Sequence, residues 1–174
     1  MSLSDRYQEL KAGINTLGID CTSQQLEKLL TYLELLERWN KAYNLTAIRD
    51  PIQMVRLHLL DSLAIHPYIQ AGKEIIDVGT GPGLPGIPLA ILNTNINFTL
   101  LDSNGKKTRF LFQAISDLSL ENAREVNQRV ENYQSQKPYD IVLSRAFSAI
   151  SDMLNQCDHL VSDKGFFLSM PGIT

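Results

Sequence analysis

Asp77, Gly79, Gly81 and Gly83, spaced two residues apart, form the stretch of this sequence that most clearly carries chemistry. They overlap and follow a short apolar run, Ile75 to Val78, whose β-branched residues predict a buried parallel strand. Glycine lacks a Cβ, so a turn rich in glycine can adopt positive φ and bring its backbone close to a ligand. A helix that begins directly after the turn adds free N–H groups at its N-terminus. Strand, glycine turn and helix together are typical of a nucleotide-type binding site.

Two kinds of ligand fit this turn. Gly81, Gly83 and Gly86 match the G-x-G-x-x-G pattern of dinucleotide-binding folds. In those folds, however, the first glycine directly follows the strand, and the glycine nearest the strand here is Gly79. Counted from Gly79, and with Asp77 at the strand end, the pattern resembles the first motif of class I S-adenosylmethionine methyltransferases. A carboxylate there suits a cofactor that carries an ammonium and a sulfonium, whereas it suits a pyrophosphate poorly. A purely connecting loop is the third interpretation, and the entropic cost of spaced glycines argues against it.

A second acidic residue, Asp102, follows the next predicted strand. It lies near the spacing of roughly 20 residues at which a carboxylate reaches the hydroxyls of a ribose. The alternative is that Asp102 is simply the N-cap of the following helix. Lys106, Lys107 and Arg109 crowd the first turn of that helix, where each cation opposes the helix dipole by roughly 0.3–1 kcal/mol. This conflict indicates either a functional basic patch or a solvated face.

The elements that position these residues begin with amphipathic helices. Apolar residues at spacings of three and four predict helices over about residues 3–17, from residue 23 past Trp39, and from residue 51 to about residue 63. Local signals mark their ends: Gly18 after the first helix, a capping box of Thr22 and Gln25 before the second, and Asp50-Pro51 before the third. We therefore expect residues 1–70 to form an N-terminal helical cap.

Strands and helices alternate in the rest of the chain. Strands are predicted at residues 75–78, 97–101, 123–127, 139–143 and 165–170. Helices separate most of them, the last over about residues 150–160. This order predicts an α/β fold with a Rossmann-like, doubly wound parallel sheet over residues 71–174.

Composition indicates an ordinary globular protein. Apolar residues make up 44% and charged residues 20%, and the net charge of −3 argues against a protein that coats nucleic acid non-specifically. A run of 18 or more apolar residues, as a membrane span requires, is missing, and so is a secretory leader. Cys21 and Cys157 lack metal-ligand spacing, so we expect free thiols, no metal site and a cytoplasmic location.

Several separate segments resemble one family, the bacterial small-subunit rRNA guanine-N7 methyltransferase, also called glucose-inhibited division protein B. The segments are Trp39-Asn40 with Asn44-Leu45-Thr46, His58-Leu59-Leu60-Asp61-Ser62, Asp77–Gly86, Leu101-Asp102-Ser103, Arg129-Val130-Glu131 and Ser144-Arg145-Ala146-Phe147. The resemblance spans essentially the whole chain. It implies methyl transfer from S-adenosylmethionine to N7 of a guanine in 16S rRNA, with the rRNA or the small ribosomal subunit as partner. We expect a monomer.

The resemblance and the strand ends together give a predicted site. The expected cofactor-binding residues are Asp77, Gly79, Gly81, Gly83, Leu84, Asp102, Val130, Glu131 and Arg145. Arg145 is also the expected catalytic residue, because it can steady cofactor and target. The expected substrate-binding residues are Arg49, His58, Lys106, Arg109 and Phe147. For Phe147 the alternative to base stacking is a place in the core, and for His58 it is a pair with Asp61 that fixes the cap to the sheet. Arg38, Lys41 and Arg56 are further candidate RNA contacts or ordinary surface charges.

The chain also departs from the family pattern. The fold normally has seven strands, but only Pro171 to Thr174 follow Met170, so we expect the last two strands to be lacking. Pro171 stands where the family has a lysine. The fifth strand is then an apolar edge around Phe166. Two other functions stay open: a methyltransferase for another substrate, and a cofactor- or ribosome-binding module without catalysis.

Overall fold

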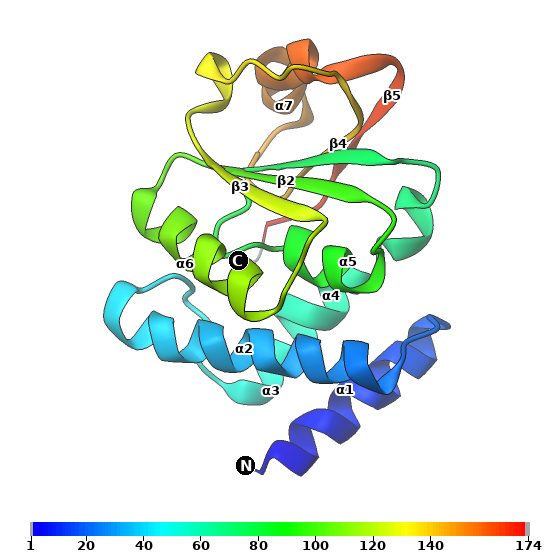
Figure 1. The fold of residues 1–174 in the computed structure, drawn as a ribbon, viewed down its shortest axis with the longest axis vertical. Coiled ribbons are helices and arrows are strands. Elements are labelled where there is room, and N and C mark those ends of the chain that lie inside the picture. The colour runs from blue at the N-terminus through cyan, green and yellow to red at the C-terminus, as the bar shows by residue number, and fades with distance from the viewer. Residues whose placement is uncertain (1, 173–174) are drawn as a thin grey trace.

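A five-stranded parallel sheet forms the centre of the computed structural model, which describes residues 2–172 (Figure 1). Its strands are β1 (Glu74–Val78), β2 (Asn97–Asp102), β3 (Ala123–Asn127), β4 (Tyr139–Ser144) and β5 (Val161–Ser169). The strand order is β3-β2-β1-β4-β5. The order reverses between β1 and β4, and a ligand of such a sheet binds beside that point, at the carboxyl ends of the strands. The predicted α/β fold is confirmed.

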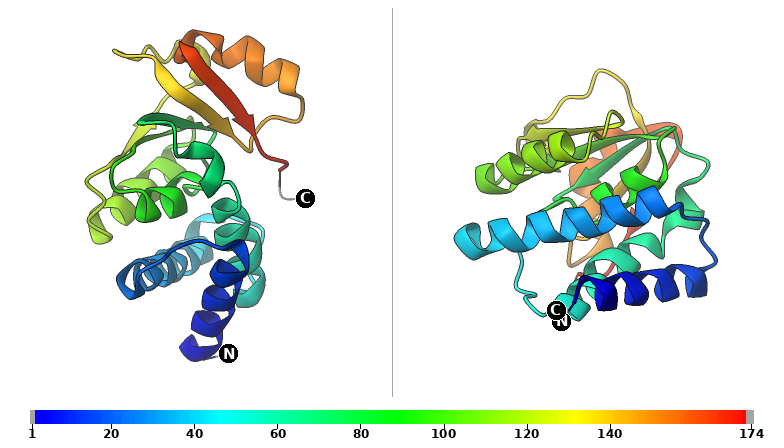
Figure 2. Two further views of the ribbon diagram at one scale, coloured as in Figure 1. Left: turned by 90° about the vertical axis from the view of Figure 1, so that its right-hand side faces the viewer. Right: turned by 60° about the horizontal axis from the view of Figure 1, so that its bottom comes forward.

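Helices cover both faces of the sheet (Figures 1 and 2). On one face lie α5 (Gly86–Leu92), α6 (Gly105–Asp117) and α2 (Ser23–Tyr43), and on the other lies α7 (Ile150–Cys157). Alternate residues of β1 enter the two cores, since Ile75 belongs to the first cluster and Ile76 to the second. Each strand of a doubly covered parallel sheet is apolar on both sides for this reason.

The N-terminal helices begin and end where local capping chemistry predicts. α1 (Leu3–Leu17) ends at Gly18 in a left-handed conformation, and Thr22 and Gln25 form the capping box that starts α2. Asp50 caps α3 (Pro51–Met54). The third predicted helix is not uniform, however. It continues as a π-helical segment, Val55–Leu60, then α4 (Asp61–Leu63), and a 3-10 turn follows at His66–Ile69.

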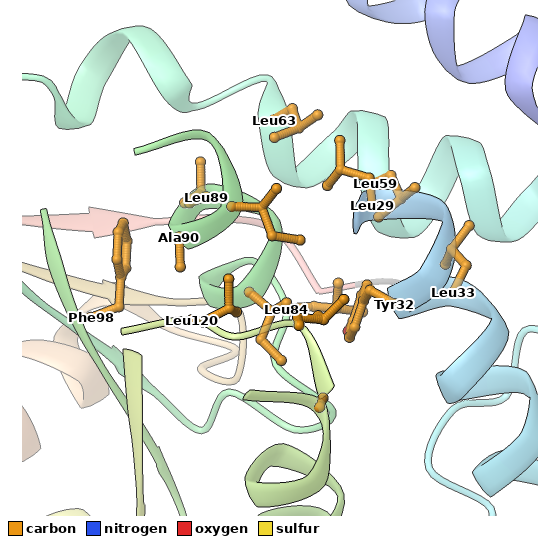
Figure 3. Close-up of a cluster of buried hydrophobic side chains, with 14 of the residues drawn as sticks. Leu29, Tyr32, Leu33, Leu59, Leu63, Leu84, Leu89, Ala90, Phe98 and Leu120 are labelled. Atoms are coloured by element: carbon orange, nitrogen blue, oxygen red, sulfur yellow. The ribbon is translucent and has the colours of Figure 1, made fainter. Parts of the chain in front are cut away.

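The helical cap and the sheet share one hydrophobic core. Leu29, Tyr32 and Leu33 of α2 pack in the same cluster as Leu84 of the glycine turn and Phe98 of β2 (Figure 3). The Tyr32 hydroxyl also donates a hydrogen bond to the Pro82 carbonyl at 2.8 Å. The cap therefore packs directly against the turn that the sequence identifies as the ligand site. A domain boundary near residue 70 stays a prediction.

The last strand differs most from its predicted bounds. β5 begins at Val161, which pairs with Tyr139 of β4. The register between the two strands then shifts, and the next pair is Ile141 with Phe166. β5 occupies the edge of the sheet, and Phe166 is exposed there, as predicted. α7 accordingly ends at Cys157, and a 3-10 turn, Asp158–Leu160, leads into the strand. In the described part of the chain, no helix is both long and apolar enough to span a bilayer.

Candidate functional site

The glycine turn joins β1 to α5 and is fastened to β2. The Gly79 and Thr80 amides donate to the Leu101 carbonyl at 2.9 and 3.0 Å. Gly79 has a φ of 67°, and a Cβ added there would lie 2.5 Å from the Cβ of Ala146. The segment after β4 therefore reaches the turn only because residue 79 has no side chain.

Gly83 has a packing role in the turn. It also has a positive φ, 96°, but its added Cβ would meet Ile87 and Leu111 rather than open space. Gly81, Gly83 and Leu84 are all buried in the turn. The structure thus shows Gly83 allowing α5 to pack closely, and a direct cofactor contact by these three residues stays a prediction.

Asp77 holds the turn from beneath. Its side chain is 0% exposed, and its Oδ2 accepts hydrogen bonds from the Thr80 hydroxyl at 2.7 Å and the Gly86 amide at 2.9 Å. Burial raises the pKa of this carboxyl to about 7, against the lowering effects of those two hydrogen bonds and of the Arg145 charge. Its Oδ1 is buried without a hydrogen-bond partner. A buried carboxylate oxygen without a partner is costly, which agrees with the raised pKa of this group.

Asp102 is also part of the turn. One carboxylate oxygen accepts from the Gly81 amide and the other from the Asn104 amide, both at 2.8 Å. Asn104, not Asp102, is the N-cap of α6, since its side chain accepts from the Lys106 amide at 3.0 Å. The alternative that Asp102 caps this helix is therefore wrong. Each carboxylate oxygen keeps a lone pair for a ligand hydroxyl.

A crevice of about 280 Å³ opens beside Gly79 at the carboxyl ends of the strands. Five of the predicted site residues line it: Gly79, Asp102, Val130, Glu131 and Phe147. Lys107, Arg129 and Gln156 also line it, and we did not predict them as site residues. Arg129 could have been found from its place next to Val130, whereas Gln156 comes from α7 and carries no sequence signal.

A larger hollow, about 480 Å³, lies at the opposite edge of the sheet, where the strands begin. Its floor is a hydrogen-bonded network in which Arg124 donates to Tyr133 at 3.0 Å, and the Tyr133 and Tyr139 hydroxyls lie 2.9 Å apart. It lacks the glycine turn and the switch in strand order, so we assign the ligand site to the smaller crevice.

Arg145 points from the end of β4 toward the helical cap. Its side chain is only 7% exposed, with Nη2 3.2 Å from Asp61 Oδ2 and Nη1 donating to the Ser62 hydroxyl at 3.5 Å. The Nη2 contact is close enough for an ion pair, but Nη2 has no aligned hydrogen bond. Arg145 is not among the crevice-lining residues, so its cofactor and catalytic roles stay predictions.

The structure changes the interpretation of His58. The predicted His58–Asp61 pair is wrong, because Asp61 pairs with Arg145 and His58 Nε2 lies 2.9 Å from the Thr46 hydroxyl. His58 is 2% exposed and is not among the crevice-lining residues. Burial, followed by the positive charge of Arg145, lowers its pKa to about 4, so the imidazole is neutral near pH 7.

The other predicted substrate residues come from separate elements. Arg49, Lys106 and Arg109 are exposed, and Arg49 donates to the Asn44 side chain at 2.7 Å. Phe147 is half-buried and packs against the second core cluster while it lines the crevice, and base stacking by its ring stays a prediction. Within residues 2–172, no three His, Cys, Asp or Glu side chains converge in a way that could hold a metal ion.

The fold and this crevice define a class I S-adenosylmethionine-dependent methyltransferase. Among solved structures, the chain is similar to an S-adenosylmethionine-dependent methyltransferase from Thiobacillus denitrificans bound to S-adenosyl-L-homocysteine. The TM-score is 0.55 and the sequence identity is 16%, and the match covers 78% of this chain and 54% of that one. It is also similar to coclaurine N-methyltransferase, with a TM-score of 0.58, 16% identity, and 97% and 53% covered. The chain spans about half of these two proteins, and at this identity the likeness concerns the fold.

Sequence comparison identifies the family. The family described as rRNA small subunit methyltransferase G matches residues 25–174. The ribosomal RNA small subunit methyltransferase G of Psychromonas ingrahamii is 50% identical over 172 residues, which cover 99% of this chain and 81% of that protein. The protein of the same name from Alteromonas mediterranea is 52% identical over 163 residues, covering 94% and 77%. The chain belongs to this family, and the predicted resemblance is confirmed.

Proposed function

We propose that this chain transfers the methyl group of S-adenosylmethionine to N7 of a guanine in the 16S rRNA of the small ribosomal subunit. The observation that carries the proposal is the crevice beside Gly79 in a chain about half identical to named rRNA small subunit methyltransferases. Other methyltransferases share the fold, so the family supplies the substrate class and the crevice supplies the cofactor half.

The residues around the crevice fit the proposed cofactor in charge and shape. Asp102, with a lone pair free on each oxygen, is proposed to accept from the ribose hydroxyls, and Val130 and Glu131 to contact the adenine. Gly79, Gly81, Gly83 and Leu84 give the turn its shape. The carboxyl of Asp77 and the guanidinium of Arg145 are proposed to match, in charge, the ammonium and the carboxylate of the methionine part. When bound, the cofactor supplies an electrophilic methyl group.

The proposed reaction needs little from the protein besides positioning. Guanine N7 carries an in-plane lone pair and no proton, so no general base is required. A well-oriented pair of reactants gains about 7–11 kcal/mol from alignment alone. Arg145 is our proposed catalytic residue, because it directly precedes Ala146 and Phe147 of the crevice lining and its guanidinium could orient both cofactor and base. His58, neutral and buried, is proposed to support the wall behind the substrate, and Phe147 to stack on the target base.

Substrate contacts beyond the crevice are proposed for exposed cations. Lys106 and Arg109 on α6, and Arg49 beyond α2, are available for phosphate contacts. We also propose that the protein acts as a monomer. We place the protein in the cytoplasm because bacterial ribosomes are assembled and used there.

Two measurements test the proposal. Calorimetric titration with S-adenosylhomocysteine should show one site, and labelled methyl should pass to N7 of one guanine in small subunits that lack the modification. Transfer to another substrate only would select a different methyltransferase. Cofactor binding without transfer to any RNA would select a binding module without catalysis.

A further inference from the structure

An aromatic hollow lies outside the crevice, between α2, α6 and β3. Its volume is about 450 Å³, and its lining includes Trp39, Arg109, Phe112, Glu125 and Asn127. Figure 1 shows α2 and α6 running side by side on this part of the molecule. None of these residues has a part in the cofactor crevice.

The hollow presents aromatic surface that the fold itself leaves uncovered. Phe112 is 62% exposed, although the neighbouring Phe110 and Leu111 are fully buried in the core. Trp39 is held in place by Phe110, with ring centroids 5.7 Å apart, and by the half-exposed Tyr43 at 5.3 Å. A rigid tryptophan edge beside an exposed phenylalanine is the kind of surface on which an unpaired nucleobase stacks.

The charges around the hollow suit the backbone of a nucleic acid. Arg38, Lys41, Lys106 and Arg109 lie on the neighbouring turns of α2 and α6, all exposed and none with an ion pair in residues 2–172. Glu125 is the acidic residue in the lining. A carboxylate there repels phosphate but can accept a hydrogen bond from the amino group of a base. Arg109 lines the hollow itself, and the other three cations are exposed on the same two helices, where they can attract the backbone of an RNA bound there.

The hollow also adjoins the crevice through consecutive residues. Lys107 lines the crevice and Thr108 lines the hollow, and likewise Gln128 lines the crevice and Asn127 the hollow. Phe112 lies five positions after Lys107 in α6, a rise of roughly 7.5 Å along the helix. The hollow and the cofactor crevice are therefore neighbours, and an RNA that binds next to the cofactor can place an unpaired base in the hollow.

We propose that the hollow between Trp39 and Phe112 binds an unpaired base of the RNA substrate close to the target guanine. The inference rests on the proposed function for the identity of the substrate. Phe112 supplies the stacking face, Arg109 contacts the adjoining phosphate, and Glu125 accepts from the base. A protein partner on the same aromatic surface is the competing occupant, and the experiment separates the two.

Trp39 makes the test direct, because it is the single tryptophan of the chain. Titration with a short single-stranded oligoadenylate at low salt should quench its fluorescence, and added salt should reverse the effect. Phe112→Ala should weaken binding by between about 5-fold and 100-fold, and Phe112→Tyr should restore it. The matched control is Tyr68→Ala, because Tyr68 is 65% exposed and lines neither the hollow nor the crevice.

Methyl transfer to small subunits completes the test. Phe112→Ala should raise KM for the subunit while it leaves kcat and the S-adenosylhomocysteine affinity unchanged. If Phe112→Ala changes neither the oligoadenylate affinity nor KM, the inference is overturned and the proposed function is unaffected. Quenching by isolated subunit proteins but not by RNA would overturn it too. If the wild-type chain transfers no methyl to any RNA, the proposed function itself fails.

Discussion

Gly79→Ala tests the close approach on which the crevice is built. Gly79 has a φ of 67°, and this left-handed conformation costs an L-residue roughly 1–2 kcal/mol. The new Cβ would also lie 2.5 Å from the Cβ of Ala146. Carbon atoms pack at about 3.5–4.0 Å, so the segment after β4 has to move outward. That segment carries Arg145 and Phe147, and the crevice therefore changes shape.

The two effects together set the expected size. Overpacking costs about 1–3 kcal/mol, so with the backbone strain the free energy of unfolding should fall by roughly 2–5 kcal/mol. In a chain of this size, each kcal/mol lowers Tm by about 2–4 °C. The affinity for S-adenosylhomocysteine should fall at least about tenfold, as for one extra methylene in a fitted pocket. Urea unfolding and calorimetric titration measure the two losses.

Gly18→Ala is the matched control, because Gly18 has the same φ of 67° and its added Cβ would meet nothing within 4 Å. It should lose only the roughly 1–2 kcal/mol of backbone strain and keep the wild-type cofactor affinity. Ala146→Gly removes the clashing methyl and should restore part of the stability in the Gly79→Ala background. If Gly79→Ala and Gly18→Ala lose equal stability, and both bind S-adenosylhomocysteine as the wild type does, the close approach has no effect and the reasoning is refuted.

Three further substitutions test the support of the turn and of the crevice rim. Burial raises the pKa of Asp77 to about 7, so between about pH 4 and 7 the folded chain keeps a proton that the unfolded chain releases, and the stability of the wild type falls as pH rises. Asp77→Asn cannot ionise, so its urea midpoint minus that of the wild type should increase over this pH range. A decrease in this difference would contradict the effect of burial. Asp61→Asn removes the charged partner of Arg145, 3.2 Å away, and should weaken S-adenosylhomocysteine binding several-fold in calorimetry, which an unchanged affinity would disprove. Tyr32→Phe deletes the hydrogen bond to the Pro82 carbonyl and should cost about 0.5–1.5 kcal/mol in urea unfolding, with equal midpoints as the opposing result.

Local chemistry explains which parts of this fold could be predicted from sequence. The capping box of Thr22 and Gln25 and the left-handed Gly18 depend on neighbours within a few residues, and both formed as predicted. The turn after β1 was predictable because its glycines and the preceding apolar run are contiguous. Asp102 was found by spacing alone, since it ends a strand that is parallel and adjacent to β1.

The parts that were missed depend on partners far away in the chain. The π-helical segment Val55–Leu60 has an unremarkable apolar pattern, which is the same as that of an α-helix. Val161 to Lys164 are mostly polar and indicate a turn, but Val161 pairs with Tyr139 of β4, so β5 begins there, before the register shift. Asp61 pairs with Arg145, which follows β4, and not with His58 of its own helical segment. This partner is 84 residues away in the sequence. Spacing along one helix could not predict it.

The segments that carry the family resemblance meet in space, and their contacts give the helical cap a role at the crevice. The Thr46 amide donates to the Asn40 side chain at 2.9 Å, and the Thr46 hydroxyl contacts His58 at 2.9 Å. The Ser62 hydroxyl donates to the His58 carbonyl and accepts from Arg145 at 3.5 Å. A continuous series of polar contacts thus runs from the exit of α2 to the crevice rim. Because a long side chain such as Arg145 keeps one geometry only when its partners are themselves fixed, these cap residues position the group that we propose to orient cofactor and guanine.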